Sequence, residues 1–209
     1  MILVYNKQGL NDTLLCLFQK ADNNIATVSE VLADNTIIRQ QEKIIGVNIA
    51  HASEKFSSLP EGVLLENTIN EEVATYLSTE IGIHAFESDT LKQNFVIGYV
   101  QERINHPDSN KLSICTVDIN TESLQIVCGA ANVDQGQKVV VATVGCMMPT
   151  GLIIEPSVLR KVDSIGMICS GRELNLPEAF QTPGILVLAN DAPIGMSFFE
   201  YFNDEMKVK

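Results

Sequence analysis

The sequence predicts a mainly β protein, with an α+β N-terminal domain at residues 1–90 and a five-stranded barrel domain at residues 91–209. Three observations support this prediction. Short apolar runs are separated by Gly, Pro, Asn and Asp throughout, as expected for strands and tight turns. Helical periodicity occurs in one segment of the first part. The charge also differs between the two parts, which favours two separate units.

The first ninety residues combine short strands with one helix. Apolar and β-branched runs predict strands at residues 1–5, 13–18, 25–31 and 43–50. Apolar residues at helical spacing predict a helix at residues 69–81 with one buried face. Thr68 and Glu71 have the spacing of a capping box, and Gly82 is a typical helix stop. The polar, acidic stretch 83–93 predicts a linker.

From residue 95 onward, the short strands and turns are typical of a small barrel. The predicted strands are residues 95–103, 112–119, 124–128, 138–144, 152–154, 167–169 and 185–188. The apolar alternation changes phase between Cys115 and Thr116, which indicates a β-bulge there. We expect His106 to be a turn residue that forms local hydrogen bonds. The nearly continuous apolar run 138–144 indicates a strand buried on both sides or at a barrel seam.

The charge limits the kind of nucleic-acid binding that is plausible. The formal net charge is -12, and residues 1–89 hold 5 Lys+Arg against 13 Asp+Glu. From residue 90 onward the counts are 9 and 13. Proteins that bind nucleic acid mainly by neutralising phosphates are basic. Binding to RNA or DNA would therefore depend on a local patch and on shape, and the second part is the more plausible place for it.

Several functional classes find no support in the sequence. No apolar tract approaches the roughly 18 residues of a membrane span, and the first residues lack the basic region of a signal peptide. We therefore expect a cytoplasmic protein without membrane contact. Five cysteines without a CxxC pair predict free, mostly buried thiols rather than disulfides or a zinc site. Motifs for nucleotide binding, zinc hydrolysis and serine hydrolysis are absent, so we expect no cofactor, no metal and no catalysis.

Specific strings in the second part are similar to a known family. They are His106–Leu112 (HPDSNKL), Ile126–Val133 (IVCGAANV), Gly136–Val139 (GQKV), Gly145–Pro149 (GCMMP) and Ser164–Ser170 (SIGMICS). Their order and spacing resemble the tRNA-binding domain at the N-terminus of the bacterial phenylalanyl-tRNA synthetase β subunit. The first ninety residues resemble the acidic leader of YtpR-like bacterial proteins, which carry the same domain without a synthetase body. The resemblance implies a five-stranded OB-fold barrel that binds tRNA or other structured RNA.

The resemblance and the nearby cations suggest a set of RNA-binding residues: Lys111, Asn132, Arg160, Lys161, Ser164, Met167, Ser170 and Arg172. The cations would contact phosphates, and the amide and hydroxyl groups would form hydrogen bonds. Met167 would pack on a base or ribose. Structural roles remain open for several of them: Lys111 as a solvated lysine, Asn132 as a loop cap, and Met167 as a core residue.

The sequence also departs from the family pattern. Glu155 and Val158 occupy positions where the family tends to be basic, and Asn110 replaces an acidic residue. Fewer cations and an added carboxylate should weaken the attraction to phosphates. Two hypotheses of function follow. The barrel binds structured RNA, or it is an OB fold that has become a protein-interaction module, with a homodimer as one form of partner.

Overall fold

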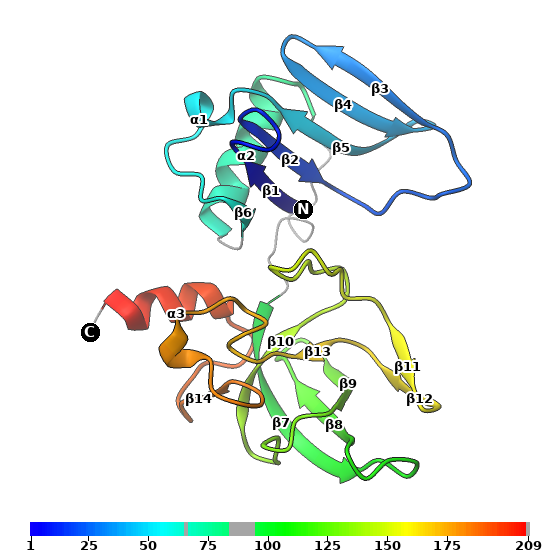
Figure 1. Ribbon diagram of the computed structural model, residues 1–209, viewed down its shortest axis with the longest axis vertical. Coiled ribbons are helices and arrows are strands. Elements are labelled where there is room, and N and C mark those ends of the chain that lie inside the picture. The colour runs from blue at the N-terminus through cyan, green and yellow to red at the C-terminus, as the bar shows by residue number, and fades with distance from the viewer. Residues whose placement is uncertain (65–66, 84–94, 208–209) are drawn as a thin grey trace. The chain divides into compact units, whose positions relative to one another are not determined.

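The computed structural model describes residues 1–64, 67–83 and 95–207 (Figure 1). The chain divides into two compact units, residues 1–93 and 94–209. Among the described residues, no helix is long and apolar enough to cross a membrane.

The N-terminal unit is an antiparallel sheet packed against a helix. Its elements are β1 (Ile2–Asn6), β2 (Thr13–Leu17), β3 (Thr27–Leu32), β4 (Asn35–Gln40), β5 (Lys43–Ile49), α1 (Ala52–Lys55), β6 (Gly62–Leu64) and α2 (Asn67–Thr79). The strand order is β3-β4-β5-β2-β1-β6. Leu3, Leu14 and Val47 of the sheet share one core with Val73 and Leu77 of α2. The four strands and the helix predicted from the sequence are confirmed, with small shifts at their ends.

Other details of this unit differ from the predictions. The sequence did not predict β4, α1 and β6. Helix α2 begins at Asn67, and the side chain of the predicted cap residue Thr68 lies outside the described part of the chain, so the capping box stays a prediction. The predicted stop is confirmed, because Gly82 has a φ of 73° and the Ile83 N–H bonds to the Leu77 carbonyl. Most of the predicted linker, residues 84–93, lies outside the described residues.

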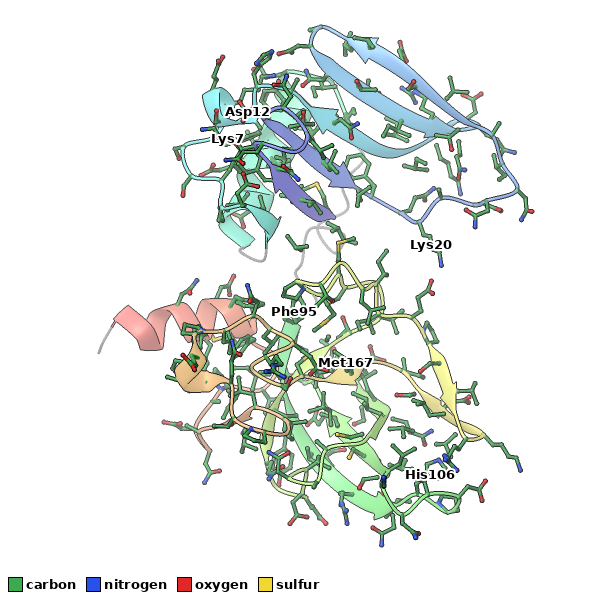
Figure 2. All side chains as sticks on the ribbon, viewed as in Figure 1. Lys7, Asp12, Lys20, Phe95, His106 and Met167 are labelled. Atoms are coloured by element: carbon green, nitrogen blue, oxygen red, sulfur yellow. The ribbon has the colours of Figure 1, made fainter. Side chains whose placement is uncertain are left out.

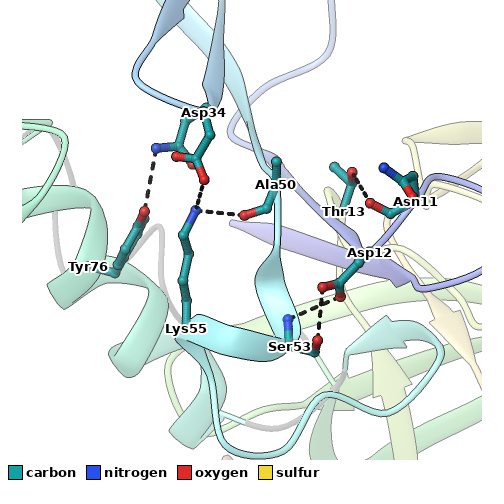
Figure 3. Close-up of polar contacts among 9 residues, drawn as sticks. Asn11, Asp12, Thr13, Asp34, Ala50, Ser53, Lys55 and Tyr76 are labelled. Carbon is teal, nitrogen blue, oxygen red and sulfur yellow. Dashed lines mark hydrogen bonds and ion pairs between the residues drawn. The ribbon is translucent and has the colours of Figure 1, made fainter.

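Two carboxylates of the acidic unit are bound by neighbouring side chains (Figure 3). Asp12 accepts hydrogen bonds from the Tyr5 hydroxyl (2.6 Å) and the Ser53 hydroxyl (2.8 Å). The bond from Tyr5 is the main cause that lowers the pKa of Asp12. Asp34 accepts a 2.9 Å bond from the Lys55 ammonium, which lowers the pKa of Asp34. These polar groups hold the loops of the unit in place.

The C-terminal unit is a closed barrel with added turns and a helix. Its elements are β7 (Phe95–Asn105), β8 (Ser113–Asp118), β9 (Ser123–Cys128), β10 (Lys138–Ala142), β11 (Ser157–Leu159), β12 (Val162–Ser164), β13 (Met167–Ile168), a 3₁₀ turn (Glu178–Phe180), β14 (Val187–Leu188) and α3 (Phe198–Lys207). The sheet order is β13-β10-β7-β8-β9. The Ile165 N–H bonds to the Gln125 carbonyl of β9 (2.8 Å) and closes the barrel. The predicted five-stranded OB barrel is thereby confirmed.

The predicted bulge in β8 is wrong. Strand β8 alternates regularly, and the shift in register lies in its neighbour β7, between Val100 and Glu102. The sequence pattern was misleading because Ser113 is buried whereas Ile114 is partly exposed. Apolarity therefore does not report which way the β8 side chains point.

One further prediction for the barrel unit is confirmed, and other elements of the unit were not predicted or are shorter than predicted. Of the two alternatives for the apolar run 138–144, burial on both sides is confirmed, because Val139 to Ala142 of β10 are all buried and the strand pairs with β7 on one side and with β13 and β14 on the other. The β11–β12 hairpin and helix α3 were not predicted. The predicted strand at residues 152–154 is reduced to an isolated bridge between Ile153 and Met147.

The prediction of free, buried cysteines is confirmed for Cys16, Cys115, Cys128, Cys146 and Cys169. Burial raises the pKa of Cys115 to about 11 and that of Cys146 to about 12. Because the thiolate is the reactive form of cysteine, these two groups stay protonated and unreactive near neutral pH.

We expect the barrel unit to fold by itself. Its strands close on one another, and its core residues Val100, Val117, Ile126 and Val139 come from the barrel itself. A fragment that starts near Leu91 should show β-type circular dichroism and a cooperative melt. A fragment without cooperative unfolding would contradict this expectation.

We also expect each single Cys→Ser substitution to lower the free energy of unfolding by about 1–3 kcal/mol. The reason is that a buried hydroxyl loses its hydrogen bonds to water and finds no partner in the protein. Urea denaturation of the five variants measures this effect. Native thiols should alkylate only slowly. A thiol that reacts fast in the folded protein, with a pKa well under 8, would contradict the assignment of packing roles to the cysteines.

Candidate nucleic-acid interface

The β11–β12 hairpin carries two adjacent cations at its tip. Leu159 pairs with Val162, so Arg160 and Lys161 are the two residues of the turn. Their φ angles are 48° and 71°, and positive φ at both positions is the geometry of a type I′ turn. This turn favours Asn and Gly, so Arg and Lys adopt it at an energetic cost. The sequence did not predict the hairpin because neither of these turn residues is present.

A buried histidine joins the tip of the hairpin to the turn after β7. His106 is 4% exposed. Its Nδ1 accepts a hydrogen bond from the Asp108 N–H (3.0 Å), so Nε2 carries the proton and donates to the Leu159 carbonyl (3.1 Å). Arg160 strengthens the junction, since its guanidinium donates to the Asp108 carbonyl (3.0 Å). The expected local hydrogen bond of His106 is confirmed, and its partner is the Asp108 N–H. Figure 2 labels His106 in the barrel unit.

The base of the hairpin is tied to strand β9. The Gln125 amide donates to the Asp163 carbonyl at 2.8 Å. The Val127 N–H donates to the Ser164 hydroxyl at 3.0 Å, and that hydroxyl in turn donates to the Gly166 carbonyl at 3.3 Å. The hairpin is therefore attached to the barrel at both its tip and its base.

Three of the predicted cations belong to this region. Lys111 is exposed and follows the turn that Arg160 contacts, and Arg160 and Lys161 are exposed at the hairpin tip. We call Lys111, Arg160 and Lys161 the hairpin cations. Arg172 is exposed on a different turn, between Ser170 and Leu176.

The polar candidates form hydrogen bonds within the protein. Both amide atoms of Asn132 bond to the backbone of Ile185, at 3.0 and 2.9 Å. Ser164 is buried and bonds as described above. The Ser170 hydroxyl donates to the Glu173 carboxylate (2.7 Å), and the Glu173 N–H donates back to that hydroxyl (3.2 Å). These bonds stabilise loops of the barrel.

The remaining residues of this region are Met167 and two exposed aliphatic residues near the hairpin. Met167 is half-buried in β13 and pairs with Ala142. Val158 is 67% exposed and Ile165 is 43% exposed, although both are aliphatic. Sequence reasoning did not identify the exposure of these two residues, because the β11–β12 hairpin that carries Val158 and directly precedes Ile165 was not predicted.

The hairpin region offers chemistry suited to an anionic surface. The hairpin cations can donate to phosphate oxygens, and the exposed aliphatic side chains can pack on sugars or bases. Acidic residues such as Asp108 and Asp163 lie in the same segments, so the local charge is mixed. Among the described residues, no group of three or more His, Cys, Asp or Glu is placed to hold a metal ion.

Comparisons with known proteins agree with this architecture. Residues 95–197 match the family described as "Putative tRNA binding domain". The chain is 43% identical over 196 residues to "Putative tRNA-binding protein YtpR" of Bacillus subtilis (strain 168), which covers 93% of this chain and 97% of that protein. It is 45% identical over 159 residues to the phenylalanine–tRNA ligase β subunit of Campylobacter jejuni (strain RM1221), covering 72% of this chain but 20% of that subunit.

Among solved structures, the MetRS-related protein from Pyrococcus horikoshii matches 54% of this chain and 96% of its own. Its sequence identity is 20% and its TM-score is 0.37, which is too low to bear on the fold. The match to the YtpR protein, in contrast, extends over nearly the full length of both chains. The chain therefore belongs to the YtpR-like family of proteins that carry this tRNA-binding domain.

Proposed function

We propose that this protein binds structured RNA, and tRNA above all, through its OB barrel. The observation that carries the proposal is the group of hairpin cations, since Arg160 and Lys161 project from a hairpin that is bonded to the barrel at both ends. The printed names of the relatives, which describe tRNA binding, support the same function. We propose the cytoplasm as its location, in keeping with its unpaired thiols.

The geometry divides the candidate residues into two groups. Lys111, Arg160, Lys161 and Arg172 are exposed cations that we propose as phosphate contacts. Asn132, Ser164 and Ser170 already bond within the protein, so we propose that they hold the surface in shape. Folded RNA is recognised largely by its shape and by contacts to its backbone. A rigid surface with a few cations suits that mode of recognition.

We propose a binding function without catalysis. The pKa of every cysteine is raised, mainly by burial, which disfavours a thiolate nucleophile. Both ring nitrogens of His106 are occupied by backbone groups, so the ring is poorly placed to transfer a proton to a ligand.

A second candidate function is protein binding through strand β3 of the N-terminal unit. β3 lies at the edge of its sheet, and all six of its residues are exposed. Val28 and Val31 are 63% and 72% exposed, and β3 contains neither Lys nor Pro. Glu30 is the one charged residue of β3, and exposed edge strands with few charges and no Pro can pair with other chains. A protein partner, including a second copy of this chain, would use this edge.

We expect weak, salt-sensitive binding of tRNA. If roughly three of the proposed cations contact phosphates at the same time, with a slope near -0.9 per contact, a fourfold rise in salt should lower the affinity by about one and a half decades. Removal of residues 1–90 should raise the affinity, because 13 acidic residues against 5 basic ones no longer repel the phosphates. Titrations of tRNA against the full chain and the barrel fragment measure both effects. If the folded fragment does not bind at low salt with magnesium, the proposed function is lost.

Arg160→Ala should weaken tRNA binding by about 1–3 kcal/mol, because it removes a charge-assisted contact. Arg39→Ala is the matched control. It removes the same charge from β4 of the N-terminal unit, where Arg39 lies 3.8 Å from Glu30. Affinities from the same titration compare the two variants. Equal effects would show that net charge, and not the hairpin, determines binding.

A further inference from the structure

The β11–β12 hairpin depends on contacts outside itself. All three residues of β11 are exposed, so this strand buries no side chain against the barrel. The turn is unfavourable on its own, because side-chain-bearing residues occupy the left-handed region at both central positions. The preferences of the turn residues therefore oppose the geometry in which the two cations are presented.

His106 supplies the bond that holds the turn. Its Nε2–H donates to the carbonyl of Leu159, the residue directly before the two cations. The ring itself is held by the Asp108 N–H at Nδ1. Its backbone is also bonded on both sides, with the N–H donating to the Leu112 carbonyl (3.1 Å) and the carbonyl accepting from the Ser109 N–H (3.3 Å).

The residue after His106 adds to this rigidity. Pro107 restricts the backbone of the residue before it to extended conformations. The imidazole is therefore a buried donor with little freedom to move, and it is aimed at a carbonyl 53 positions away in sequence. Arg160 makes a parallel contact, but its guanidinium is exposed and would be free to turn toward a ligand.

We propose that His106 is a positioning residue for RNA binding. It holds the Arg160–Lys161 turn in its left-handed conformation, so that both cations meet the RNA without further ordering, and it does not itself touch the RNA. Preorganised side chains lose less conformational entropy on binding. This inference rests on the proposed function, because it explains how the same surface is kept ready for its ligand.

The test uses the full-length protein and tRNA titrations over a series of salt concentrations. His106→Ala should weaken binding about threefold to tenfold, because the released turn no longer brings both cations to the phosphates together. The salt slope should become shallower by about 0.9 for each cation that loses its contact. A residue that only stabilises the fold would leave the slope unchanged in the protein that remains folded.

A double-mutant cycle separates positioning from a general effect. Adding His106→Ala to Arg160→Ala should cost less than His106→Ala costs alone, because coupled residues are non-additive. Lys138→Ala is the control, since Lys138 lies in β10 with its ammonium over the Tyr99 ring, 5.3 Å from the ring centroid. His106→Ala and Lys138→Ala should be additive. Additivity with Arg160→Ala as well would overturn the inference.

The outcomes distinguish the two proposals. If Arg160→Ala weakens binding but folded His106→Ala binds with unchanged affinity and slope, the inference about His106 fails and the proposed function stands. If the wild-type protein does not bind tRNA at low salt, the proposed function fails first. Thermal melts check folding. If His106→Ala does not fold, His106→Phe, which fills the space of the ring but has no N–H donor for the Leu159 carbonyl, is judged by the same affinity, slope and cycle.

Discussion

Closure of the barrel along β9 is the constraint on which the functional unit depends. β9 pairs with β8 on one side only, and an open edge would leave backbone groups unpaired. The last residue of β12 and the residue after it close this edge, with the Ser164 hydroxyl and the Ile165 N–H. Gly166 then turns the chain at a φ of 124°, where an added Cβ would lie 3.1 Å from the Ala142 carbonyl. The Ser-x-Gly string is thus explained by closure.

The position of the β11–β12 hairpin follows from the same closure. Because Ser164 is both the last residue of β12 and a partner of β9, the hairpin must leave the barrel at that point. Its tip is then held by His106. The strained turn at Arg160 and Lys161 persists because the surrounding contacts determine it. Two cations are thereby fixed on a protein that is acidic overall.

The acidic charge of the chain and an RNA partner are compatible only if binding is local. With a formal net charge of -12, long-range electrostatic repulsion opposes the approach of a polyanion. The exposed cations and aliphatic side chains near the hairpin can act only at short range, when the protein and the RNA are already in contact. The N-terminal unit is a well-packed sheet and helix with its own exposed edge at β3. That edge, rather than its charge alone, is the basis for proposing a protein partner.

Much of the fold could be predicted from the sequence. The helix Asn67–Thr79, the strands with clear apolar runs, the OB barrel and the burial of the cysteines all follow from local patterns or from the family strings. These predictions succeed because the apolar residues of a strand or helix recur with the period of its buried face. Lys111 and Arg160 could be selected as candidate cations because Lys111 belongs to a family string and Arg160 carries the guanidinium of the expected binding loop.

Only the tertiary structure decided how the candidate residues are used. Asn132 bonds to Ile185 and His106 bonds to Leu159, each across 53 positions of sequence. The bulge lies in β7, and the polarity of β8 does not reveal it because the polar residue Ser113 is buried there. Local sequence shows which groups can form hydrogen bonds but not which distant partner each group meets, because that partner is set by closure of the barrel.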